Sequence, residues 1–93
     1  MASESQKSVR AKKRAVTKQV NLIKQLMAEE ETEKVVQEVV IIKRLFREFT
    51  EATECHVAAL ERDQDIEESD VDYATIQSSY IELLSAVKAH KEN

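Results

Sequence analysis

The chain has 93 residues, which is enough for one small domain, and a formal net charge of −4 from 14 Lys and Arg against 18 Asp and Glu. It contains no Gly and no Pro, so folds that need tight turns or Gly-rich phosphate loops are excluded: hairpin-rich β folds, Rossmann folds and P-loop domains. With 42% hydrophobic, 34% charged and 4% aromatic residues, the composition is typical of long helices rather than of a disordered chain.

The first segment with helical periodicity runs from about residue 5 to residue 28. Its apolar residues form one stripe with alternating steps of three and four, interrupted by Lys13: Val9, Val16, Val20, Ile23 and Met27. The acidic residues 29–31 and Thr32 follow this stripe. We expect the chain to turn there and Thr32 to cap the second helix, with the acids close to its positive N-terminal end.

The second segment, residues 33–62, has the clearest heptad pattern. The heptad positions expected to face a neighbouring helix, which we call seam positions, are Val35, Val39, Ile42, Phe46, Phe49, Thr53, His56 and Leu60. A second apolar stripe consists of Ile41, Leu45, Ala52, Cys55 and Ala59. Two stripes imply two neighbouring helices. Val36 and Val40 widen the apolar face further, so we expect this half of the helix to be buried either by the other two helices together or by another subunit.

The third segment covers about residues 66–90. Its seam positions are Ile66, Ser69, Tyr73, Ile76, Tyr80, Leu83, Val87 and His90. Two starts are possible for this helix, because Asp65 and Ser69 are each followed three residues later by an acid, as in a side-chain cap. Without a Gly to end the preceding helix, the sequence does not decide between them.

Together these segments predict an all-α fold with a single domain over residues 1–93. Short links between long helices favour antiparallel neighbours, so we expect an up-down-up bundle of three helices with coiled-coil-like packing. An open helical hairpin with a displaced third helix is the main alternative. Lys13, Thr53 and His56 are polar residues at seam positions, where such residues commonly set register or partner number.

The charges are distributed unevenly along the chain. Residues 1–24 hold seven Lys and Arg and one Glu, a net charge of +6, so the remaining residues carry −10. The candidate nucleic-acid contacts are Arg10, Lys12, Lys13, Arg14 and Lys18. The interpretation that we favour is internal complementarity with acids at the start of the third helix, namely Asp63, Asp65, Glu67, Glu68, Asp70 and Asp72.

No constellation in the sequence predicts catalysis, a metal or a cofactor. The alternate acids that begin at Asp63 imitate a calcium loop, but its sixth and twelfth positions are Glu68 and Ala74 instead of Gly and Glu. Cys55 and His56 are adjacent, so on a helix their side chains diverge by about 100° and do not easily chelate one ion. We expect no enzyme activity, no small-molecule substrate and no evident pocket in so narrow a bundle.

The sequence also bears on location. No stretch approaches the roughly 18 consecutive apolar residues that span a bilayer, and the chain opens without an apolar signal-peptide core. Its single cysteine, Cys55, cannot form an intramolecular disulfide and suits a reducing compartment. We therefore expect an intracellular, cytoplasmic protein with no membrane association.

Four short motifs resemble those of a known family. They are Lys13-Arg14-Ala15-Val16-Thr17-Lys18, Leu45-Phe46-Arg47-Glu48-Phe49, Asp65-Ile66-Glu67-Glu68-Ser69 and Tyr80-Ile81-Glu82-Leu83-Leu84. In this order, from about Arg10 to Lys88, the chain resembles the N-terminal helical region of BEL/Pao-type LTR retrotransposon polyproteins, a domain of unknown function. The resemblance implies a Gag-side, non-enzymatic segment used in self-association or particle assembly. It leaves open whether the chain is a fragment of a polyprotein or a stand-alone product.

The function that we expect is a non-enzymatic interaction or assembly module that forms a homodimer or higher homo-oligomer. The residues predicted to carry self-association lie in the first half of the second helix: Val36, Val40, Ile41 and Leu45. One rival is a nucleic-acid-binding accessory protein that uses the basic first helix. The other is a monomeric structural bundle.

Overall fold

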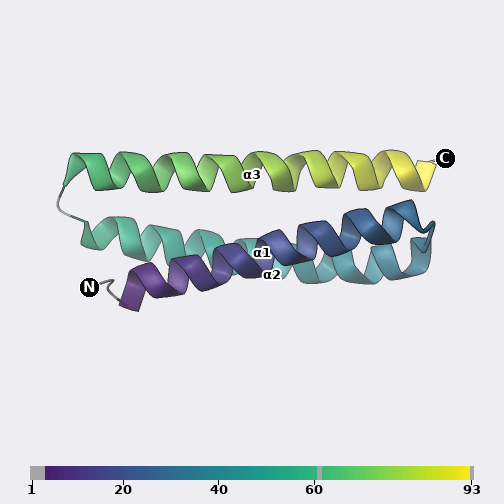
Figure 1. Ribbon diagram of the computed structural model, residues 1–93, viewed down its shortest axis with the longest axis horizontal. Coiled ribbons are helices and arrows are strands. Elements are labelled where there is room, and N and C mark those ends of the chain that lie inside the picture. The colour runs from purple at the N-terminus through teal and green to yellow at the C-terminus, as the bar shows by residue number, and fades with distance from the viewer. Residues whose placement is uncertain (1–3, 61, 93) are drawn as a thin grey trace.

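The structure, a computed structural model, describes residues 4–60 and 62–92, which form three long α-helices (Figure 1). They are α1 (Glu4–Ala28), α2 (Thr32–Ala59) and α3 (Asp63–Glu92). Successive helices run in opposite directions, and the molecule is a rod with extents of 48 × 19 × 16 Å. The predicted all-α fold with three antiparallel helices is confirmed.

The heptad pattern correctly predicts which side of each helix faces the core. Every seam position expected in α2, from Val35 to Leu60, is buried or half-buried, and the same holds for the seam of α3 from Ile66 to His90. Buried apolar side chains of all three helices form one core: Val16, Val20, Ile23, Leu26, Val35, Val39, Ile42, Phe49, Ile76, Leu83 and Val87. Since α3 contributes to this core, the open hairpin with a displaced third helix is not the observed arrangement.

The three helix pairs differ in how closely they pack. The backbones of α1 and α2 lie close together along most of their length, whereas the backbone of α3 lies farther from both. Aromatic side chains explain the separation from α2, because the rings of Phe46 and Phe49 stack on those of Tyr80 and Tyr73 between the two helices. Large rings at an interface hold the backbones farther apart than Val and Ile do.

The link from α1 to α2 is a tight turn built without glycine. Glu30 adopts a left-handed conformation with φ of 59°. Its N–H donates to the carbonyl oxygen of Met27 at 3.1 Å, and the N–H of Glu31 donates to that of Leu26 at 3.0 Å. This pair of bonds is a Schellman motif, which satisfies the last carbonyls of α1.

The expected cap of α2 is wrong. Thr32 is the first residue of the helix, and the N-cap residue is Glu31, whose side chain makes no capping hydrogen bond. The Schellman motif ends at Glu31, so helical geometry resumes one residue earlier than the cap prediction assumed. The Thr32 hydroxyl instead lies 3.5 Å from Nε2 of His90 on α3.

The predicted boundaries between α2 and α3 are also wrong by several residues. α2 ends at Ala59 rather than near residue 62, because Leu60 is extended. α3 already begins at Asp63, and the N–H of Ile66 donates to the carbonyl of Arg62 at 3.1 Å, so both proposed starts, Asp65 and Ser69, lie inside the helix. Acids in a first helical turn are stabilised by the helix dipole, which favours this earlier start over a side-chain cap.

Within residues 4–60 and 62–92, no helix has a stretch that is both long and apolar enough to cross a bilayer.

Candidate interaction surfaces and a polar cavity

The first half of α2 exposes two valines. Val36 is 42% exposed and Val40 is 69% exposed, and they lie one helical turn apart. Neither α1 nor α3 covers them, so of the two expected alternatives, burial by the other two helices together does not hold for these valines, and burial by another subunit stays a prediction. We call Val36 and Val40 the valine face.

The other two residues predicted for self-association do not belong to this face. Ile41 and Leu45 are half-buried, and Leu45 packs against the core. They lie on the side of α2 that also carries Glu38 and Glu48, whose carboxylates contact Gln19 and Lys12 of α1. Ile41 and Leu45 therefore border α1, while the valine face points elsewhere.

An exposed isoleucine of α3 lies near the valine face along the bundle. The Phe46–Tyr80 stack aligns the middle of α2 with the middle of α3. Ile81, the residue after Tyr80, is exposed and therefore lies within about two helical turns of Val40 along the bundle axis. Ile81 falls outside the seam pattern of the third helix, so the periodicity of the sequence does not single it out.

The basic residues of α1 separate into two groups. Lys12 Nζ lies 3.3 Å from Glu48 Oε2 on α2, and Lys13 Nζ lies 3.8 Å from Asp72 Oδ1 on α3. Arg10, Arg14 and Lys18 are exposed and form no ion pair within the described part of the chain. The expected complementarity with the start of α3 is thus seen at Asp72, while the pairing with Glu48 was not anticipated.

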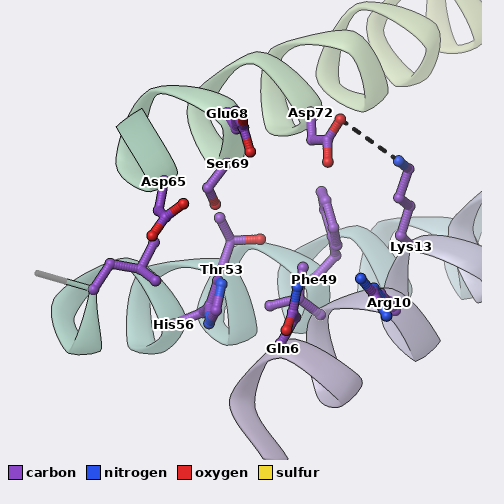
Figure 2. Close-up of a pocket in the computed structure, with 12 residues that line it drawn as sticks. Gln6, Arg10, Lys13, Phe49, Thr53, His56, Asp65, Glu68, Ser69 and Asp72 are labelled. Atoms are coloured by element: carbon purple, nitrogen blue, oxygen red, sulfur yellow. Dashed lines mark ion pairs between the residues drawn. The ribbon is translucent and has the colours of Figure 1, made fainter. Parts of the chain in front are cut away.

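A cavity of about 540 Å³ lies between the start of α1, the end of α2 and the start of α3 (Figure 2). The labelled residues that line it come from all three helices: Gln6, Arg10, Lys13, Phe49, Thr53, His56, Asp65, Glu68, Ser69 and Asp72. The expectation that this bundle has no evident pocket is therefore wrong. Lys13, Thr53 and His56, the polar residues noted at seam positions, all line this cavity.

The cavity has a physical cause in the packing of α3. Tyr73 stacks on Phe49 with a ring-centroid distance of 5.6 Å and holds α3 away from α2. Ser69, the seam residue one turn earlier, is too small to fill the space that results. Sequence reasoning missed the cavity because it depends on the spacing between helices and not on the pattern along one helix.

Thr53 lies at the base of this cavity with an unusual environment. Its side chain is 6% exposed, and its hydroxyl has no hydrogen-bond partner among the described residues. The nearby Thr50 differs, since its hydroxyl donates to the carbonyl of Phe46 at 3.0 Å and lies 2.9 Å from the hydroxyl of Tyr73. A buried hydroxyl without a partner destabilises the fold.

The described residues do not form a metal site, because they contain no cluster of three or more His, Cys, Asp and Glu side chains that could hold an ion. The thiol of Cys55 is free and exposed.

No model of a known protein family matches this chain, and it has no significant match among characterised proteins or solved structures. The resemblance to the BEL/Pao polyprotein region stays a prediction.

Proposed function

We propose that this chain is a non-enzymatic helical interaction module that self-associates through the valine face of α2. The observation that carries the proposal is the 69% exposure of Val40 beside Val36. An apolar face that one chain leaves in water is stabilised when a second copy covers it, and a symmetric dimer is the commonest arrangement. We further propose that the module works in a reducing compartment inside the cell, which suits the exposed thiol of Cys55.

The resemblance to a Gag-side polyprotein region supports the same kind of role, because self-association is what particle assembly requires. Ile81 is a further exposed apolar side chain, on α3, at a similar height along the bundle. Because Leu45 packs against the core, its substitution would disturb the fold as well as any interface. The valines are therefore the better positions for a test.

The test is sedimentation equilibrium with light scattering on the unmodified chain and on Val36→Glu and Val40→Glu. We expect the unmodified chain to self-associate at tens of micromolar and both variants to be smaller species with unchanged helicity. Val71→Glu is the matched control, since Val71 is 60% exposed but lies on α3. A monomeric unmodified chain, or an equal effect of Val71→Glu, would contradict the proposal.

A second candidate function is binding to nucleic acid through α1. It is favoured by the exposed side chains of Arg10, Arg14 and Lys18, which have no ion-pair partner among the described residues and recur every four residues on one face of the helix. The net charge of −4 opposes it through long-range repulsion of a polyanion.

This candidate predicts micromolar binding of RNA or DNA at about 0.15 M salt that weakens steeply as salt rises. Replacing Arg10, Arg14 and Lys18 with Gln should then abolish binding, whereas replacing Lys12 and Lys13 should chiefly affect stability. Without salt-dependent binding by the unmodified chain, this candidate fails.

A further inference from the structure

The cavity at the end of the bundle has two walls of opposite charge. Arg10 and Lys13 line it from α1, and three carboxylates line it from α3 (Figure 2). These carboxylates are spaced by three and four residues, so they share one side of α3: Asp65, Glu68 and Asp72. A cavity between such walls has an electric field directed from α1 to α3.

The two walls neutralise each other only in part. The ion pair drawn across the cavity joins Lys13 and Asp72 at 3.8 Å, a long separation between partly exposed groups. Arg10 and Asp65 form no ion pair within the described residues. A ligand that enters the cavity therefore gains charged partners without breaking a buried ion pair.

The base of the cavity offers both a polar and an apolar contact. Thr53 has a side chain more than nine-tenths buried whose hydroxyl lacks a partner among the described residues. Figure 2 shows this side chain projecting from α2 into the space beneath Ser69. Val9, Phe49 and Leu60 supply apolar lining. The volume of about 540 Å³ falls within the range of small-molecule sites.

We infer that this cavity binds a small zwitterion, an aliphatic molecule with an ammonium group at one end and a carboxylate at the other. Its carboxylate would lie towards Arg10 on α1 and its ammonium towards Asp65 and Glu68 on α3. The aliphatic segment packs on Val9 and Leu60, which are half-buried, and the Thr53 hydroxyl gains a hydrogen-bond partner. A simple anion would face three carboxylates, and a simple cation would face Arg10 and Lys13, so neither matches both walls.

This site is independent of the proposed self-association. The cavity lies at the end of the rod where α1 begins, whereas the valine face lies towards the turn between α1 and α2 (Figure 1). Failure of one proposal therefore leaves the other untouched.

The test is an NMR titration of the full chain, following the backbone amide signals of Thr53 and Ser69. The probes are 4-aminobutyrate, 6-aminohexanoate and 8-aminooctanoate, with hexylamine and hexanoate as analogues that carry one charge. We expect at least one ω-amino acid to shift both signals in a saturable way, with a Kd at least tenfold lower than that of either analogue. No saturable shift with any ω-amino acid, or equally tight binding of hexylamine or hexanoate, would overturn the inference.

Variants then locate the contacts. Arg10→Gln and Asp65→Asn should each weaken binding of the best probe at least fivefold. Arg14→Gln is the matched control for Arg10→Gln, because Arg14 is an exposed arginine on the same helix and is not among the residues that line the cavity. If Arg14→Gln weakens binding as much as Arg10→Gln does, the effect is one of net charge and the assigned site is wrong.

Discussion

The rings of Phe46 on α2 and Tyr80 on α3 stack with centroids 4.2 Å apart and 11° between their planes. Phe49 and Tyr73 form a second stacked pair, with 15° between their planes. These four residues are all the aromatic residues of the chain. The whole aromatic content is therefore used to join α2 to α3, and it sets the spacing that leaves the cavity beyond Tyr73.

The first prediction concerns Phe49, which is 1% exposed and is the largest fully buried side chain. Phe49→Ala should lower the free energy of unfolding by about 3 to 5 kcal/mol, because it leaves a void in the core and removes the stacking partner of Tyr73. Phe46→Ala should lower it less, since Phe46 is only half-buried. Urea denaturation followed by circular dichroism measures both. A loss below about 1 kcal/mol for Phe49→Ala would contradict the assigned core.

The second prediction follows from Tyr80. Burial raises the pKa of its phenol above the ordinary value of 10.0, because desolvation penalises the phenolate. When the folded pKa lies above the unfolded one, stability is fully present below the unfolded pKa and is lost as the pH rises towards the folded pKa. The free energy of unfolding should therefore fall above about pH 10, and more steeply than in Tyr80→Phe.

The Tyr80→Phe variant keeps the stack on Phe46 but removes the titrating hydroxyl. The informative quantity is the difference in stability between the two proteins as a function of pH, because it isolates the Tyr80 hydroxyl. Parallel curves between pH 9 and 12 would contradict the prediction.

The third prediction concerns Glu30, the residue with φ of 59° in the Schellman turn. A left-handed conformation favours glycine, which has no Cβ to clash with the backbone. Glu30→Gly should raise the free energy of unfolding by about 0.5 to 1 kcal/mol, although the added freedom of the unfolded chain reduces the gain. Thermal unfolding measures this change in stability. Glu29→Gly is the control and should not raise the free energy of unfolding.

The pattern of the sequence predicts the seams of the helices well but not their ends. Seam positions follow from a period that the chain repeats many times, so one unusual residue such as Lys13 does not obscure them. Helix ends depend on a few local bonds. The turn at Glu30 adopts a Gly-type conformation with a residue that gives no hint of it, and this single feature accounts for the wrong cap at Thr32.

The exposure of the four residues proposed for self-association was also predictable only in part. The first half of α2 has more apolar residues than two neighbouring helices need to cover, and Val36 and Val40 are exposed within the single chain. The other two candidates, Ile41 and Leu45, are half-buried because they lie on the side of α2 that faces α1. The sequence alone does not show on which side α1 packs. The periodicity of the sequence does not predict the cavity. The cavity arises because the Tyr73–Phe49 stack sets the distance between α3 and α2, and the small side chain of Ser69 does not fill the space that is left.

The last prediction compares two threonines that lie three residues apart on α2. Thr53→Val should raise the free energy of unfolding by about 1 kcal/mol, because it removes a buried hydroxyl that has no partner among the described residues. Thr50→Val should lower it by a similar amount, because the Thr50 hydroxyl lies 2.9 Å from the hydroxyl of Tyr73, which would lose this contact.

Both variants exchange a hydroxyl for a methyl group at nearly constant shape. Changes of opposite sign in the free energy of unfolding would therefore reflect hydrogen bonding and not packing. For a domain of this size, a change of 1 kcal/mol shifts the melting temperature by roughly 4 to 8 °C, which differential scanning calorimetry resolves easily. If Thr53→Val melts below the unmodified chain, the Thr53 hydroxyl has a partner in solution. An ordered water in the cavity would be such a partner, and the hydroxyl would then no longer favour a ligand at this site.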